Sequence, residues 1–127
     1  MNHLLDIHTM IWFISGDKQL SAKARKSIEA EDAENFVSIA SLWEIAIKIS
    51  LGKLELKKPF TYLAEQILQN NFHILPVSFE DTLLISTLPF HHRDPFDRMI
   101  AVQSLNRKLT LITKDEIYQE YKVKMLW

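Results

Sequence analysis

The stretch from His91 to Glu116 limits the possible folds more than any other part of the sequence. Its Asp94-Pro95 pair is typical of a helix start, because aspartate caps helices and proline needs no backbone donor in the first turn. Residues 96–105 are mostly apolar and predict a buried helix. Residues 109–113 predict a strand too apolar to have one face in water, so they favour a parallel sheet that is covered on both sides.

Strands and helices alternate along the rest of the chain. The pattern predicts strands at residues 3–7, 35–39, 73–77 and 121–127, the last at an edge of the sheet, and helices at residues 9–15, 20–31, 41–51, 59–69 and 79–88. This alternation predicts a three-layer α/β/α domain with a mainly parallel central sheet. We expect one domain over residues 1–127, because a chain of 127 residues is long enough for one hydrophobic core.

Composition excludes several classes of protein. With 47% hydrophobic and 24% charged residues, the chain has the balance of an ordinary globular domain. It has no cysteine, which excludes a disulfide framework and a thiolate metal site. We find no membrane-length apolar run and no secretion signal, so we expect a cytoplasmic protein with no membrane partner. The formal net charge of −1 means that any contact with nucleic acid must be local, made through a metal ion or a basic rim.

Four acidic residues lie where expected strands end or helices begin: Asp6, Glu44, Asp97 and Asp115. In a parallel α/β topology these positions meet at the carboxyl edge of the sheet. Carboxylates are costly to bury unpaired, and clustered carboxylates raise one another's pKa unless a cation neutralises them. An oxygen-only set of ligands predicts Mg²⁺ or Mn²⁺. Such ions can activate water and stabilise the leaving oxygen when a phosphodiester is hydrolysed.

Three of these acids also have a structural explanation of their own. Asp6 and Asp115 could each cap the helix or turn that follows. Glu44 could complete a capping box with Ser41 and form an ion pair with Lys48 one turn later. The metal site is the simpler hypothesis only when the acids are considered together.

The acids around Pro95 have a structural explanation as well. Asp94 and Asp97 could cap the following helix as a pair, and capping is the role that we expect for Asp94. Arg93 and Arg98 flank these acids, and each could contact a phosphate or form an ion pair with Asp94 or Asp97.

We expect structural roles for the remaining candidates. No His-x-x-x-His pair accompanies the histidines, which favours structural or solvent-exposed positions for His8, His91 and His92. The large aromatic side chains are expected in the core or at an interface, and not as platforms for nucleic-acid bases. They are Trp12, Phe13, Trp43 and Trp127.

Four motifs resemble, in order and spacing, those of VapC-like toxins in the PIN domain family. They are Leu4-Leu5-Asp6-x-His8 followed by Trp12, Ser38-x-x-Ser41-x-Trp43-Glu44, His92-Arg93-Asp94-Pro95-Phe96-Asp97-Arg98, and Thr113-x-Asp115. The resemblance covers nearly the whole chain. It implies that the metal-binding, catalytic acids of the family fall on Asp6, Glu44, Asp97 and Asp115.

The resemblance also implies an activity and partners. Similar proteins are Mg²⁺- or Mn²⁺-dependent endoribonucleases, usually homodimers, and a cognate antitoxin inserts its tail into the acidic groove. This sequence departs from the family at Ile7, where Thr is common after the first acid. The departure leaves an alternative open, a PIN-like module that binds RNA or a partner and cuts little. A phospho-acceptor signalling domain would need an acidic pair after the first strand, where Asp6 stands alone.

Overall fold

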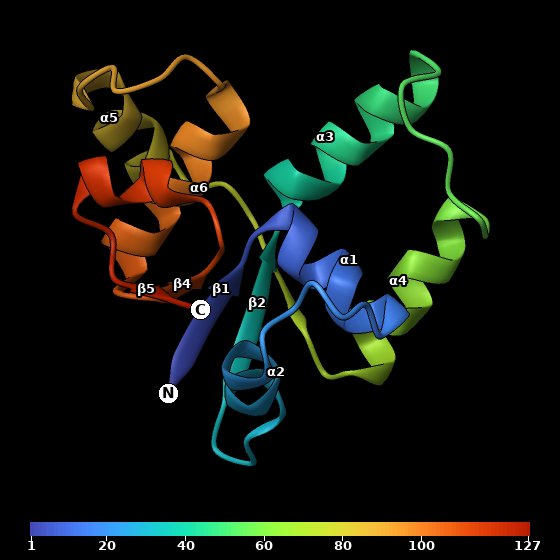
Figure 1. The fold of residues 1–127 in the computed structure, drawn as a ribbon. Helices are drawn as coiled ribbons and strands as arrows, with labels where there is room; N and C mark the ends of the chain where they lie inside the picture. The colour runs from blue at the N-terminus through green and yellow to red at the C-terminus, as the bar shows by residue number, and fades with distance from the viewer.

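A five-stranded parallel sheet forms the centre of the fold, and the computed structural model describes every residue from Met1 to Trp127 (Figure 1). Its strands are β1 (Asn2–Leu5), β2 (Glu34–Ser38), β3 (His73–Leu75), β4 (Thr110–Ile112) and β5 (Met125–Leu126). They lie in the order β3-β2-β1-β4-β5, and all four neighbouring pairs are parallel. The predicted parallel sheet is therefore confirmed, as is the edge position of the last strand.

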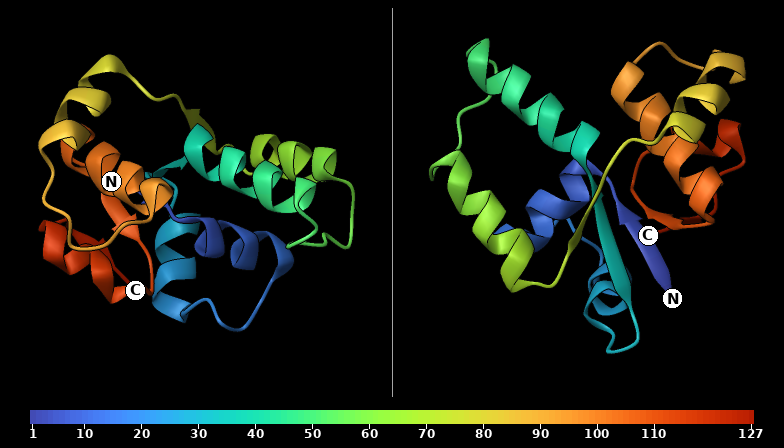
Figure 2. Two further views of the ribbon diagram at one scale, coloured as in Figure 1. Left: turned by 90° about the horizontal axis from the view of Figure 1, so that it is seen from above. Right: turned by 180° about the vertical axis from the view of Figure 1, so that it is seen from behind.

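Helices cover both faces of the sheet (Figures 1 and 2). One face is covered by α1 (Ile7–Ser15), α2 (Ala22–Glu29), α3 (Ile39–Ser50) and α4 (Phe60–Gln69). The other is covered by α5 (Phe79–Thr87), α6 (Pro95–Arg107) and the 3₁₀ helix η1 (Glu116–Tyr121). None of these helices is long and apolar enough to cross a membrane. The predicted three-layer α/β/α architecture is confirmed.

The central strand β1 and its neighbour β4 contribute to both hydrophobic cores. Leu4 of β1 and Leu111 of β4 belong to the core under α5 and α6, whereas Leu5 and Ile112 belong to the core under α1 to α4. All four side chains are fully buried. Successive side chains of a strand point to opposite faces, so a strand between two cores must be apolar at every position. This requirement explains the continuous apolar runs in the sequence.

Several expected boundaries were wrong. The strand expected at residues 73–77 ends at Leu75, and the strand expected at residues 121–127 covers only Met125–Leu126, because Tyr121 ends a 3₁₀ helix. Two further corrections concern helix starts. The first strand ends at Leu5 and not at Ile7, because Asp6 caps a helix that begins at once. The third helix begins at Ile39 and not at Ser41, with the Ser38 hydroxyl accepting a hydrogen bond from the Ala40 backbone N–H. Ser41 therefore lies inside the helix, and the expected capping box with Glu44 does not form. At the ends of β1 and β2, a polar side chain caps the next helix, and no loop intervenes.

The buried carboxylate of Asp81 joins α5 to α6. It forms a capping box with Ser78 and accepts hydrogen bonds from Asn106 Nδ2 at 2.9 Å and Arg107 Nη1 at 2.8 Å. Burial by itself raises the pKa of Asp81, but the hydrogen bonds from Arg107, the Ser78 backbone and Asn106 outweigh it and hold the pKa below its usual value. The carboxylate is therefore ionised and paired, and it fixes the position of the helix that carries Asp97.

Asp81→Asn should lower the free energy of unfolding at pH 7 by about 1.5–3 kcal/mol, since it weakens hydrogen bonds to a charged acceptor. Because the folded-state pKa is lowered, this stabilisation is present above the usual aspartate range and is lost as the pH falls through the lowered value. Urea denaturation should therefore show a smaller difference between wild type and variant in acid. The exposed neighbour variant Glu80→Gln is the control, and an equal loss there would contradict the assignment.

Candidate functional site

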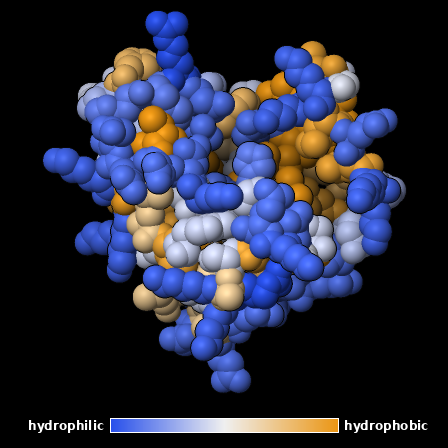
Figure 3. All heavy atoms as spheres, viewed as in Figure 1, coloured by the Kyte–Doolittle hydropathy of each residue, from blue (hydrophilic) through white to orange (hydrophobic).

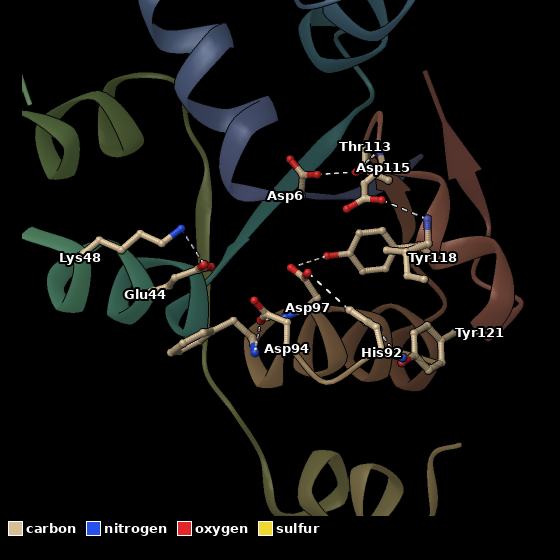
Figure 4. Close-up of polar contacts among 12 residues, drawn as sticks. Asp6, Glu44, Lys48, His92, Asp94, Asp97, Thr113, Asp115, Tyr118 and Tyr121 are labelled. Carbon is tan, nitrogen blue, oxygen red and sulfur yellow. Dashed lines mark hydrogen bonds and ion pairs between the residues drawn. The ribbon is translucent and has the colours of Figure 1, made fainter. Parts of the chain in front are cut away.

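The four acids singled out in the sequence lie at the carboxyl edge of the sheet, on four different elements. Asp6 follows β1, Asp115 follows β4, Asp97 is in the first turn of α6, and Glu44 is on α3. Figure 4 shows these side chains arranged around one space between α3 and α6. The common edge expected from the topology is therefore observed.

The carboxylate of Asp6 is buried and held from two sides. Its Oδ1 accepts a hydrogen bond from the Thr9 backbone N–H at 2.8 Å, which caps α1. Its Oδ2 accepts a hydrogen bond from the Thr113 hydroxyl, and Thr113 Oγ1 in turn accepts one from the Asp115 backbone N–H at 3.1 Å. Thr113 thus connects the acid after β1 to the acid after β4 (Figure 4). The cap expected for Asp6 is real, and it leaves the carboxylate at the edge of the sheet.

Asp97 lies among other acids and has two neutral or weakly basic neighbours. The Tyr118 hydroxyl donates a hydrogen bond to Oδ1 at 3.1 Å, and His92 Nε2 lies 3.4 Å from Oδ2. Burial raises the pKa of Asp97, and the nearby carboxylates of Asp94 and Glu44 raise it further, while Tyr118 and His92 lower it. No Lys or Arg pairs with Asp97. The carboxylate is therefore held at a site that disfavours its own charge.

Tyr118 shows how close the acids are to one another. Burial raises the pKa of its hydroxyl, and the negative charges of Asp97, Asp6 and Asp115 all raise it further. One buried phenol is thus within the electrostatic reach of three of the four acids. Sequence analysis missed Tyr118, because nothing in the run after Asp115 shows that its side chain turns back toward α6.

The ion pair proposed for Glu44 and the caps proposed for Asp94 and Asp115 are also observed. Glu44 Oε2 lies 3.1 Å from Lys48 Nζ. Asp94 caps α6 by accepting hydrogen bonds from the backbone N–H groups of Phe96 and Asp97, and Asp115 caps η1 through Ile117. These caps fix the carboxylates in place, since each uses an oxygen of its acid to bind a backbone donor.

His92, in the segment before α6, and Arg98, in the first turns of α6, both have structural roles. His92 Nδ1 lies 2.7 Å from the Tyr121 hydroxyl, which agrees with the structural role expected for this histidine. Arg98 is buried, donates hydrogen bonds to the carbonyl oxygens of Pro89, Leu88 and Ile85, and lies over the Phe90 ring. The expectation that Arg98 contacts a phosphate or an acid was therefore wrong, because the orphan carbonyls at the end of α5 bind it first.

The acids suit a divalent cation by their chemistry. Their donor atoms are all oxygen. Burial raises the pKa of Asp97, and the nearby carboxylates of Asp94 and Glu44 raise it further, as expected where no cation neutralises them. No group of three or more His, Asp or Glu side chains is gathered closely enough in this structure to hold a metal ion. The use of Asp6, Glu44, Asp97 and Asp115 as joint ligands therefore stays a prediction.

Asp97→Asn should raise the free energy of unfolding of the metal-free protein at pH 7, because the amide removes a charge that its surroundings disfavour. The folded-state pKa of Asp97 is raised, so ionisation costs stability above that pKa. The cost is absent below the ordinary aspartate value of about 3.9, where the carboxyl is protonated in both states. The advantage of the variant should therefore vanish on acidification in urea denaturation with EDTA.

Asp32→Asn, at an exposed acid far from the site, serves as the control and should change stability little at either pH. A loss of stability in Asp97→Asn of the same size at pH 7 and pH 3.5 would make Asp97 a purely structural anchor.

Comparison with known proteins agrees with this geometry. The sequence profile of the PIN domain family matches residues 4–124. A comparison with curated proteins found no match. The fold is similar to that of VapBC2 from Rickettsia felis bound to a DNA fragment from their promoter, with a TM-score of 0.74, 16% identity, and coverage of 99% of this chain and 98% of the other.

Two further solved structures have a similar fold. VapBC-1 from nontypeable Haemophilus influenzae gives a TM-score of 0.68 at 18% identity, covering 99% of this chain and 97% of the other. A toxin–antitoxin complex from Klebsiella pneumoniae gives 0.59 at 18% identity, covering 89% and 86%. At such identities the likeness is one of fold. The match of the family profile over residues 4–124 confirms the resemblance to the PIN domain family that the four sequence motifs indicated.

Proposed function

Because the chain belongs to the PIN domain family, we propose that it is a metal-dependent endoribonuclease and the toxin of a toxin–antitoxin pair. One observation carries the proposal: Asp97 lies in a field of further carboxylates with no Lys or Arg of its own. Such a cluster is costly without a cation. In a nuclease that binds a divalent ion, the ion would neutralise this cluster of carboxylates.

The proposed ligands of Mg²⁺ or Mn²⁺ are Asp6, Glu44, Asp97 and Asp115. A bound ion of this kind lowers the pKa of a water molecule and stabilises the leaving oxygen of a phosphodiester. The protein's part is to hold the carboxylates in a fixed orientation. Thr9 and Thr113 do this for Asp6, and Tyr118 does it for Asp97.

RNA is the proposed substrate, on the strength of the sequence resemblance. With a net charge of −1, the protein has no general attraction for a polyanion, so the substrate must be held by contacts close to the acids. Lys114, beside Asp115 at the same edge, is one cation in a position to make such a contact. Lys48 pairs with Glu44, and it would offset part of the negative charge on that side.

The proposed partners are a cognate antitoxin and a second copy of this chain. Large apolar side chains are exposed on several helices, among them Trp43 on α3 and Phe79 on α5, at 63% and 74% exposure. Figure 3 shows apolar side chains gathered in a hollow on the α3 and α4 side of the molecule. Exposed apolar surface of this kind marks interaction sites. An antitoxin tail with a basic side chain would complement the acids.

Ile7 supports the alternative of a PIN-like module that binds RNA or a partner and cuts little. Its side chain is the first of α1 and packs against the core that contains Leu5 and Met10, so it offers no hydroxyl beside Asp6. Thr113, which follows the neighbouring strand β4, donates a hydroxyl hydrogen bond to Asp6. We therefore favour the active enzyme, and the cleavage assay below separates the two.

The purified protein should cut single-stranded RNA when Mg²⁺ or Mn²⁺ is present and stop when EDTA is added. Asp97→Asn should lower the cleavage rate by at least about 100-fold, the scale of losing a group that acts only at the transition state. Asp94→Asn is the matched control, because it removes a neighbouring charge while asparagine keeps the helix cap, and Asp94 is not among the proposed ligands. Equal rates for wild type and Asp97→Asn would remove Asp97 from the site. A wild type that binds RNA without cutting it would favour the alternative.

Light scattering should give a molar mass of twice the 14.9 kDa of one chain, because the exposed apolar side chains favour burial against a second copy. The measurement should be made at high micromolar concentration, with the antitoxin absent. A mass of one chain under these conditions would contradict the homodimer and leave the chemistry of the acids untouched.

A further inference from the structure

Two adjoining hollows lie beside the acids, and Lys114 lines both. The first has a volume of about 190 Å³ and is lined by Asp6, His8, Trp12, Lys114 and Asp115. The second, of about 460 Å³, is lined in part by Thr113 and Trp127. Two of the proposed metal ligands thus form part of the wall of a small cavity whose other side is aromatic.

The aromatic side chains of these hollows form a continuous row. The His8 and Trp12 rings lie 5.7 Å apart at 37°, and the Trp12 and Trp127 rings lie 6.0 Å apart at 65°. The spacing of His8 and Trp12 along α1 puts both on one side of that helix, and Trp127 follows β5. His8 is exposed, and both tryptophans are half-buried: they pack against the core and also line the hollows. They are core residues, as expected, but they also line a cavity next to the acids.

This combination suits a nucleotide. Nucleic-acid bases stack on aromatic side chains whatever their sequence, and cations contact the phosphates between them. The first hollow has room for one base, and Lys114 stands beside it with its ammonium group exposed to solvent. A base reaches such a platform only when it is free of pairing, because duplex RNA hides its faces in the stack. A protein segment would need several apolar contacts, whereas Trp12 is the only apolar residue of the first hollow.

We infer that the first hollow binds a nucleotide of single-stranded RNA next to the phosphate that is cut. Its base stacks on Trp12 and His8, Lys114 contacts its phosphate, and the strand continues over Trp127. This subsite rests on the proposed nuclease function and adds to it the residues that would hold one unpaired base beside the acids. His8 and Trp12 thereby acquire a role in binding.

Mononucleotide binding tests the subsite without any bond to cut. Adenosine 5′-monophosphate should bind the Mg²⁺-loaded protein at least about fivefold more tightly than ribose 5-phosphate, because only the former can stack. Trp12→Leu should abolish this preference, and His8→Ala, at an exposed position with little risk to folding, should reduce it. Trp43→Leu is the matched control and should keep it, since Trp43 lies on α3 outside both hollows. Calorimetry or fluorescence titration measures the binding of both ligands to the wild type and to the three variants.

Lys114→Ala should weaken both ligands by the same factor, whereas Lys26→Ala, on the exposed side of α2, should change neither. With single-stranded RNA as substrate, Trp12→Leu and Trp127→Leu should raise KM and leave kcat nearly unchanged. Equal binding of the two phosphates by the wild type would overturn the subsite, and so would a preference that survives Trp12→Leu. If the wild type binds neither ligand, the nucleotide subsite is wrong, and the aromatic rings would be assigned to contact with a protein partner.

These outcomes are separable from those of the nuclease assay. If the protein cuts RNA but shows no preference for the base-bearing phosphate, the subsite is wrong and the nuclease assignment stands. If the preference depends on Trp12 but no RNA is cut, the subsite stands and the nuclease assignment fails.

Discussion

The hydrogen bond from the Thr113 hydroxyl to the Asp6 carboxylate joins the ends of the neighbouring strands β1 and β4, and its two residues are 107 positions apart in the sequence. Around it, Asp6 caps α1 by accepting a hydrogen bond from the Thr9 backbone N–H, and the Asp115 backbone N–H donates a hydrogen bond to Thr113 Oγ1. The last residues of β1 and β4 are thus fixed relative to each other at the edge where ligands of parallel sheets bind. The positions of Asp6 and Asp115 both depend on this link.

Capping and metal binding are compatible at this edge. A helix cap requires a carboxylate at the end of a strand, held by backbone N–H groups in one orientation. A metal site requires the same rigidity, because its ligands must not have to be ordered on binding. Asp6 and Asp115 accept backbone hydrogen bonds and still lie at the edge, while Asp94 caps α6 and leaves Asp97 one turn further on, facing Tyr118. The fold therefore uses local helix chemistry to position the acids.

Much of the fold could be predicted from the sequence, and the failures have a common cause. The buried strand at β4, the Asp94 cap and the edge strand followed from local pattern, because each depends on neighbours along the chain. The cap of α3 was assigned to Ser41 instead of Ser38, since both serines precede the same apolar helix. Tyr118 and Arg98 were missed or misassigned because their partners lie in other elements, which no spacing rule reveals.

Of the site itself, the sequence predicted the four acids and their common edge, and it could not predict how they are held. Nor did it reveal that His8 and Trp12 line a cavity with Asp6, because part of the cavity wall is formed by Lys114 and Asp115, which follow β4 and are distant in the sequence. The proposed function at this edge therefore depends on contacts between distant segments, while the residues that would carry it are found in short sequence motifs.

The central claim is that Asp6, Glu44, Asp97 and Asp115 bind a divalent ion together. Anomalous diffraction from crystals grown with Mn²⁺ tests it most directly, because the ion is located without any assumption about activity. The account predicts an anomalous peak with carboxylate oxygens of these residues, or waters held by them, at coordinating distance. A well-occupied Mn²⁺ elsewhere on the protein, with no peak between α3 and α6, would contradict it.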